Sequence, residues 1–225
     1  MNNAQDDRLA AGLAKIGLVL RHHAWADAGR RGLTPTQSQV LAILEACDGD
    51  GISVSRLAAQ LAVSQPTVSD AVAALERKGL VARSRSDDDA RVVLVRLTAP
   101  GRGIARQAAQ WPDVLLRAID SLDAAERAVF VRGLIKMIRS LQEDKQIPLA
   151  RMCPSCTYFR PHAHADQSRP HHCAFVDAPI GDADLRIDCR DHEAAEEALR
   201  PRLWQLFIEG RSPGADGPLP AMSNS

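Results

Sequence analysis

The chain has 225 residues, with 28 basic and 28 acidic side chains and 45% hydrophobic residues. These values are typical of an ordinary soluble globular protein with one large domain or one medium domain and an appendage. No apolar run is long enough to span a membrane, and the N-terminus lacks the basic and apolar regions of a signal peptide. We therefore expect a cytoplasmic protein without membrane contact and without disulfides.

The charge is unevenly distributed. Residues 1–150 carry 20 basic and 17 acidic side chains, whereas residues 151–225 carry 8 and 11. Residues 77–106 contain eight basic side chains, and their acids are confined to Asp87, Asp88 and Asp89. A local basic stripe in a neutral protein predicts a polyanion-binding surface that is limited to this segment. A solvated, arginine-rich surface is the alternative.

The first third of the chain predicts four helices. The first carries one apolar stripe, made of Leu9, Leu13, Ile16 and Leu20. The second begins with a capping box of Thr34 and Gln37. Ser53 and Ser64 cap two further short helices, and Gly79 is expected to follow the last of them. Two short helices joined by a tight turn indicate a helix-turn-helix.

The next segment, "LVARSRSDDDARVVLVRLT", has two β-rich arms around an acidic tip and predicts a hairpin. A hairpin directly after a helix-turn-helix is a wing. Two more helices follow, one over residues 100–119 and one that Asp123 and Glu126 cap. The apolar stripes at both ends exceed what a small DNA-binding core buries, and this predicts a helical dimerisation layer.

The stretches "LTPTQSQVLAIL", "VSQPTVSDAVAALERKGLV" and "DAR…LTAPG" occur here in a fixed order. The region around them, residues 8–143, resembles the MarR family of bacterial winged-helix regulators. The resemblance implies a mainly α fold with a small β-wing, in which a winged helix-turn-helix DNA-binding lobe joins a helical dimerisation layer. It implies a homodimeric, sequence-specific transcriptional regulator, more a repressor than an activator and not an enzyme, that binds a pseudo-palindromic operator. The alternative is a metal- or redox-sensing module that uses the winged helix for protein contacts.

The helix capped by Ser64 is expected to enter the major groove. The side chains expected to face base edges are Gln65, Thr67 and Ser69. Pro66 suits contact with a thymine methyl, and the Ser64 hydroxyl and the helix amides suit phosphate.

In the wing, the resemblance implies that Arg91 enters the minor groove and that Asp89 orients its guanidinium. Arg83 and Arg85 are candidates for phosphate contact, and a solvated strand face explains them equally well.

Related regulators bind small, often aromatic ligands between the dimer layer and the DNA lobes. By resemblance, His22, His23 and Trp25 near the end of the first helix, and Trp111, are the candidates for such a pocket here. His22 and Trp25 are taken as the pocket residues, with interface packing as the favoured alternative for all four. The sequence does not identify the effector, and response to metal or redox state is the other possibility.

The cysteines divide the chain. Residues 1–148 are predicted to form the winged-helix and dimerisation domain, residues 149–210 a cysteine-rich extension, and residues 211–225 a disordered end. Four of the five cysteines lie between residues 153 and 189, two of them at Cys-x-x-Cys spacing. Such clustering predicts metal ligands. A disulfide set does not suit the compartment, no βαβ pattern supports a thioredoxin-like motif, and no hydrolase motif accompanies a catalytic zinc.

We therefore predict one metal centre per chain, held by four of the five residues Cys153, Cys156, Cys173, Cys189 and His192. The pair "CPSC" and "CRDH" favours Zn²⁺. An iron–sulfur cluster on the four cysteines is the alternative. Because the extension has few apolar residues, we expect the metal to staple it, and we expect a final helix from about His192 that Pro201 interrupts.

Overall fold

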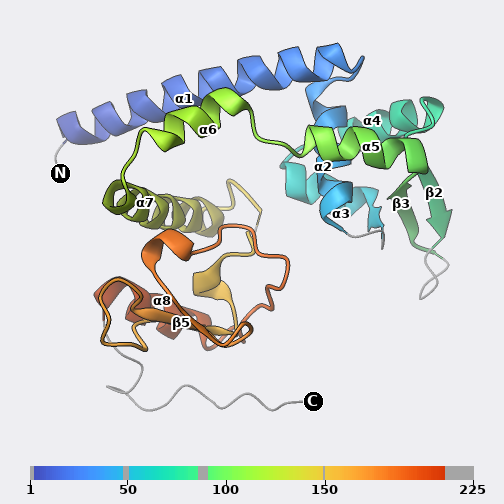
Figure 1. Ribbon diagram of the computed structural model, residues 1–225. Coiled ribbons are helices and arrows are strands. Elements are labelled where there is room, and N and C mark those ends of the chain that lie inside the picture. The colour runs from blue at the N-terminus through green and yellow to red at the C-terminus, as the bar shows by residue number, and fades with distance from the viewer. Residues whose placement is uncertain (1–2, 48–50, 86–90, 149, 211–225) are drawn as a thin grey trace. The chain divides into compact units, whose positions relative to one another are not determined.

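A computed structural model describes residues 3–47, 51–85, 91–148 and 150–210. The chain divides into two compact units, residues 1–120 and residues 121–225, which we call the N-terminal and C-terminal units (Figure 1). The sequence predicts a domain boundary at residue 148, and the long helix that precedes this position lies in the compact unit that contains the cysteines. The predicted disordered end, residues 211–225, lies outside the described residues.

The N-terminal unit follows the predicted order of helices. Its helices are α1 (Asn3–Arg30), α2 (Pro35–Ala46), α3 (Val54–Leu61), α4 (Gln65–Arg77), α5 (Ala99–Ala108) and α6 (Asp113–Asp120). The capping box of α2 is confirmed, since the Thr34 hydroxyl accepts the Gln37 amide at 3.2 Å and the Gln37 side chain accepts the Thr34 amide at 3.2 Å. Ser53 and Ser64 cap α3 and α4 as predicted.

One expectation for this unit is wrong. Residues 100–119 do not form a single helix, because α5 ends at Ala108 and α6 begins at Asp113. Pro112 lies between them, and its ring removes the amide that a continuous helix would bond to the carbonyl of residue 108. The Pro112 carbonyl instead accepts the Leu115 and Leu116 amides of α6, at 2.9 and 3.2 Å.

The predicted wing is present as an antiparallel hairpin of β2 (Val81–Arg85) and β3 (Val93–Leu97), paired from Val81 with Leu97 to Arg85 with Val93. The short strand β1 (Ile52–Ser53) adds to the other side of β3. The core below the sheet is formed by buried side chains from α2, α3, α4 and the wing. Its fully buried members include Val40, Leu41, Leu57, Val68, Val72, Leu75 and Val95.

The C-terminal unit begins with α7 (Ala124–Glu143), whose predicted capping box of Asp123 and Glu126 is confirmed with both bonds at 2.9 Å. It continues with the 3₁₀ turn η1 (Cys153–Ser155), the strands β4 (Phe159–Arg160), β5 (His171–Cys173) and β6 (Ala178–Ile180), the 3₁₀ turn η2 (Asp182–Asp184) and helix α8 (Arg200–Glu209). The three strands form one antiparallel sheet in that order. The last helix starts at Arg200 rather than near His192, because Pro201 fits the first turn of a helix, where an amide is not needed.

Helix α7 supplies part of the core that the cysteine-rich sequence lacks. Its Ile135 is fully buried in a cluster with Met152, Phe159, Leu185 and Phe207. The guanidinium of Arg132, also on α7, donates to the Phe207 carbonyl at 3.1 Å and lies 5.0 Å from the centre of that ring. Within the described part of the chain, no helix has the length and apolarity needed to cross a membrane.

Candidate functional site

Helix α4 has a buried apolar face and an exposed polar N-terminal end. Ala62 ends α3 in the left-handed conformation, with φ of 52°, and this makes the tight turn of the helix-turn-helix. The Ser64 hydroxyl then accepts the Thr67 amide at 3.4 Å and lies 2.7 Å from the Thr67 hydroxyl. The side chains of residues 64–67 are exposed, whereas Val68 and Val72 are buried. The first turn of α4 therefore presents amides, hydroxyls and an amide side chain to solvent.

The structure brings most of the other predicted DNA-binding residues to the same lobe. Ser69 is half-buried on α4, and Arg85 and Arg91 are exposed on the two arms of the wing. Arg83 lies 3.6 Å from the Glu76 carboxylate of α4, an exposed pair that contributes about 0–1 kcal/mol and links the wing to the helix. Asp89 lies outside the described residues.

A cavity of about 330 Å³ lies where the end of α1 meets the start of α6. His23 and Trp111 line it, whereas His22 and Trp25, the two residues taken for the pocket, do not. Its charged lining includes Arg30, Arg31, Arg117, Asp27 and Asp113. Helical spacing accounts for the difference, because neighbours on α1 point about 100° apart.

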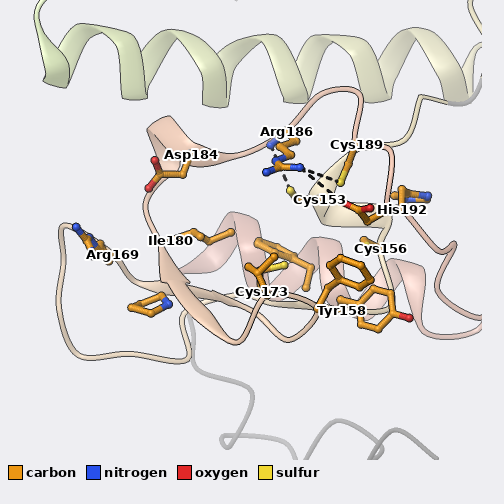
Figure 2. Close-up of a pocket in the computed structure, with 15 residues that line it drawn as sticks. Cys153, Cys156, Tyr158, Arg169, Cys173, Ile180, Asp184, Arg186, Cys189 and His192 are labelled. Atoms are coloured by element: carbon orange, nitrogen blue, oxygen red, sulfur yellow. Dashed lines mark hydrogen bonds and ion pairs between the residues drawn. The ribbon is translucent and has the colours of Figure 1, made fainter. Parts of the chain in front are cut away.

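A larger cavity, of about 440 Å³, lies within the C-terminal unit (Figure 2). It is lined by all five predicted metal ligands, Cys153, Cys156, Cys173, Cys189 and His192. We call it the cysteine cavity. The fold therefore brings the five residues to one cavity, although they span 40 residues of the chain, and their role as metal ligands stays a prediction.

Backbone pairing explains why the cysteines meet. The Cys153 amide donates to the Arg186 carbonyl at 3.1 Å, and the Cys189 amide donates to the Arg151 carbonyl at 3.0 Å. Residues 186–189 therefore run beside the "CPSC" turn. Cys173 reaches the same place from the sheet, where it pairs with Phe159.

Backbone amides and one guanidinium point at the thiols. The Arg186 amide donates to Cys153 Sγ at 3.2 Å, and the Arg186 guanidinium lies 3.7 Å from Cys189 Sγ. The pKa of the Cys153 thiol is raised to about 11, chiefly by burial and in part by the nearby thiols of Cys189, Cys156 and Cys173, against the effect of the Arg186 amide. Burial also raises the pKa of Cys156, against the effect of the Tyr158 and Glu193 amides. The four thiols are thus close enough to interact electrostatically. Hydrogen-bond donors are in place for the thiolate forms of Cys153, Cys156 and Cys189.

The remaining histidines of the extension make structural contacts. His171 is fully buried, its Nδ1 accepts the His162 amide at 3.1 Å, and its Nε2 donates to Asp182 at 3.0 Å. Burial lowers the pKa of His162, whose Nε2 lies 3.2 Å from the Phe207 carbonyl. None of these rings lines the cysteine cavity.

The five predicted ligands do not converge on one point. Among the described residues, no three Cys, His, Asp or Glu side chains are arranged to hold a single metal ion. The Nε2 of His192 lies 3.0 Å from the Ser155 hydroxyl, which itself donates to the Met152 carbonyl, so this ring nitrogen is a donor. The donor set suits a metal centre chemically, and the four cysteines line a cavity of about 440 Å³.

Asp182 predicts a pH dependence for this unit. Its hydrogen bond from His171, and then the Arg132 charge, hold the pKa of the carboxyl below its ordinary value. A pKa that is lower in the folded than in the unfolded state stabilises above the unfolded value, about 4, and this stabilisation is lost as the pH falls through the folded value. We expect the temperature at which the C-terminal unit unfolds to fall as the pH is lowered below about 4. In the Asp182→Asn variant this temperature should depend less on pH.

Thermal unfolding of the full chain between pH 2 and 7 measures this effect, with hydrogen exchange of α8 reporting the C-terminal unit. Glu196→Gln, an exposed carboxylate in the same unit, is the matched control and should keep the wild-type pH dependence. Equal acid sensitivity in wild type and Asp182→Asn would contradict the assignment.

Comparisons with known proteins agree with the N-terminal architecture. The sequence pattern of the MarR family matches residues 31–92, which run from before α2 into the wing. An HTH-type transcriptional repressor of Mycobacterium bovis is 31% identical over 142 residues, which are 61% of this chain and 98% of that protein. The organic hydroperoxide resistance transcriptional regulator of Bacillus subtilis is 31% identical over 84 residues, which are 37% of this chain and only 57% of that protein.

Among solved structures, FabT of Streptococcus pneumoniae in complex with DNA has a TM-score of 0.52 at 27% identity, and the match covers 61% of this chain and 97% of that one. The matches to the M. bovis repressor and to FabT each cover about three fifths of this chain, which is enough to include the helices, the helix-turn-helix and the wing. The M. bovis repressor is matched over nearly its whole length, and the family pattern falls on the predicted DNA-binding lobe. The chain belongs to the MarR family of winged helix-turn-helix transcriptional regulators.

Proposed function

We propose that this protein is a transcriptional repressor that binds a pseudo-palindromic DNA site as a homodimer in the cytoplasm. The observation that carries the proposal is the first turn of α4, where residues 64–67 are exposed while Val68, Val72 and Leu75 anchor the helix in the core. A polar helix end on a rigid lobe is what reading of a major groove requires. Membership of the MarR family supports the same function.

The recognition step follows from the donors on α4. The amides at the start of the helix and the Ser64 hydroxyl suit phosphate oxygens, which fix the register of the helix on the duplex. Gln65 carries both a donor and an acceptor and suits the N6 and N7 edge of adenine. Thr67 offers a hydroxyl and a methyl group, and Pro66 an apolar surface.

The wing adds charge beside this helix. Arg85 and Arg91 lie on its two arms, next to the tip. A guanidinium in the minor groove gains from the strong negative potential where that groove is narrow. We infer that Arg91 takes this role, and that Arg83, through its ion pair with Glu76, holds the wing against α4.

The homodimer is supported by apolar side chains that a single chain leaves exposed. On α1, Leu9 and Leu18 are about 60% exposed, and Ile16 and Val19 are more than 40% exposed. Leu9 and Ile16 are seven positions apart and so lie on one side of α1, and exposed apolar side chains that line up in this way mark a surface for a partner. A two-fold axis through such a surface gives two copies of α4, which fits two half-sites about one helical turn apart.

For a small effector, the cavity beside His23 and Trp111 is the better candidate than the predicted pair His22 and Trp25. Trp111 provides an aromatic face, and Arg30, Arg31 and Arg117 provide positive charge. A small aromatic anion is the ligand class that this lining suits. Binding there would alter the separation of the two DNA-binding lobes and so the affinity for the operator.

Two substitutions test the DNA contacts. We expect Gln65→Ala and Arg91→Ala each to weaken operator binding by about 10-fold or more, since one base or minor-groove contact is worth about 1–3 kcal/mol. Gln65→Ala should mainly reduce discrimination between base pairs. Fluorescence anisotropy with labelled duplexes measures both effects.

Lys136→Ala is the matched control for loss of charge, because Lys136 is exposed on α7 in the other unit. It should bind DNA as wild type does. If Gln65→Ala and Arg91→Ala both retain wild-type affinity, the alternative function, a sensing module that uses the winged helix for protein contacts, becomes the better account.

A further inference from the structure

The cysteine cavity combines three features that the DNA-binding function does not use. Four cysteines from separate segments line it, its volume is about 440 Å³, and hydrogen-bond donors point at its sulfur atoms. We propose that this cavity binds an iron–sulfur cluster through Cys153, Cys156, Cys173 and Cys189. This inference is independent of the proposed repressor function.

The arrangement of the cysteines suits a cluster better than a single Zn²⁺ ion. A single Zn²⁺ holds sulfur at about 2.3 Å, so four thiolates around it lie only about 4 Å from one another. The described side chains contain no trio of Cys, His, Asp or Glu with a geometry of that kind. The cysteines instead surround a cavity, as they would around a cluster whose thiolates bind different iron atoms.

Hydrogen-bond donors to the sulfur atoms also suit a cluster. The Arg186 amide lies 3.2 Å from Cys153 Sγ, and the Tyr158 and Glu193 amides donate to the Cys156 thiol. Amides that point at ligand sulfur stabilise the negative charge of a thiolate cluster and tune its reduction potential. These amides are held in place by the pairing of residues 151–157 with residues 186–195.

The cavity also provides the positive charge that a buried cluster requires. Four thiolates with a cluster carry net negative charge, and burial of that charge needs a counter-charge. The Arg186 guanidinium supplies it, 3.7 Å from Cys189 Sγ and 3.8 Å from the Asp191 carboxylate (Figure 2). Arg169 lines the same cavity.

Cys173 is a better fourth ligand than His192. A zinc knuckle would use either Cys173 or His192 with the other three cysteines. Cys173 is fixed on β5 by its pairing with Phe159, and its thiol is close enough to interact with those of Cys153 and Cys156. The Nε2 of His192 is committed to the Ser155 hydroxyl. The cavity is therefore a four-cysteine site, and His192 lies at its edge.

The wild-type chain, purified without oxygen or reconstituted with Fe²⁺ and sulfide, tests the proposal. We expect a brown protein with broad visible absorption that bleaches on reduction, and with about two or four iron atoms and as many acid-labile sulfides per chain. A colourless protein that binds one zinc per chain, and that takes up no iron and sulfide on reconstitution, overturns the proposal.

Variants identify the ligands. We expect Cys173→Ser to fall below about a tenth of the wild-type iron content, and His192→Ala to keep it, because a cluster uses thiolate ligands. Cys47→Ser, in α2's C-terminal cap, is the matched control and should also keep it. Loss of iron in His192→Ala with retention in Cys173→Ser contradicts the four-cysteine site. Circular dichroism of each variant distinguishes loss of a ligand from loss of the fold. DNA binding by the wild type, with or without the cluster, tests the proposed function separately.

Discussion

Gly101→Ala is expected to destabilise the N-terminal unit by about 2 kcal/mol or more, as overpacking against a rigid neighbour does. A Cβ at Gly101 would lie 1.8 Å from the Leu80 carbonyl oxygen and 2.8 Å from its carbon. This backbone cannot move easily, because the same oxygen accepts the Thr98 amide at 3.1 Å and Leu80 directly precedes β2. Helix α5 must therefore shift away from the base of the wing.

Gly103→Ala is the matched control, since Gly103 is in the same helix and a Cβ there meets no atom within 4 Å. Gly103→Ala should stabilise the N-terminal unit by up to about 1 kcal/mol, because alanine is a better helix former than glycine. Urea unfolding of the two variants measures both changes. Similar midpoints for Gly101→Ala and Gly103→Ala would show that α5 does not approach Leu80 as described.

Phe207→Ala is expected to have the largest effect in the C-terminal unit, a loss of about 3–5 kcal/mol. Phe207 is fully buried on α8, with its ring centre 5.9 Å from that of Phe159, 5.5 Å from His171 and 5.7 Å from Trp204. The Arg132 guanidinium lies over the ring, 5.0 Å from its centre. Removal of the ring leaves a cavity among rigid aromatic groups and takes away a cation–π contact.

Phe175→Ala is the control, because Phe175 is half exposed in the same unit. Phe175→Ala should lower the free energy of unfolding by less than about 1 kcal/mol, as most substitutions near the surface do. Hydrogen exchange of the α7 and α8 amides reports the C-terminal unit by itself. If both variants lose the same protection, Phe207 is not the centre of this core.

The features that the sequence predicted well are those fixed over a few residues. Thr34, Ser53, Ser64 and Asp123 all cap the helices that they were expected to cap, because a cap depends only on amides two or three positions away. The wing was recognisable from its change to a β-rich pattern. The single helix over residues 100–119 was wrong because the apolar positions were given more weight than Pro112.

The C-terminal unit was harder to predict, because its structure depends on distant contacts. Strands of two or three residues, such as β4 and β5, are too short to show an alternating pattern. The role of α7 in this core rests on contacts such as that of Arg132 with Asp182, 50 positions away. His171 and His172 are adjacent in sequence, and only the pleat of β5 places one inside and the other outside.

The cysteine cavity could be predicted only in part. Cys-x-x-Cys spacing and the clustering of the cysteines pointed to residues that the structure brings to one cavity, and their role as metal ligands stays a prediction. Whether their sulfur atoms meet at a point or surround a space depends on how residues 186–195 pair with the "CPSC" turn. The sequence alone favoured zinc, and the cluster that we propose instead rests on the volume of the cavity and the position of Arg186.

The central claim, that this protein represses transcription by binding DNA, is tested most directly with the wild-type chain and the DNA upstream of its own gene. Anisotropy titrations should give an affinity at least about 1,000-fold higher for that duplex than for a random one of the same length. Binding should weaken steeply between about 50 and 200 mM salt, as phosphate contacts by α4 and the wing require. Equal, salt-insensitive binding to both duplexes would contradict the account.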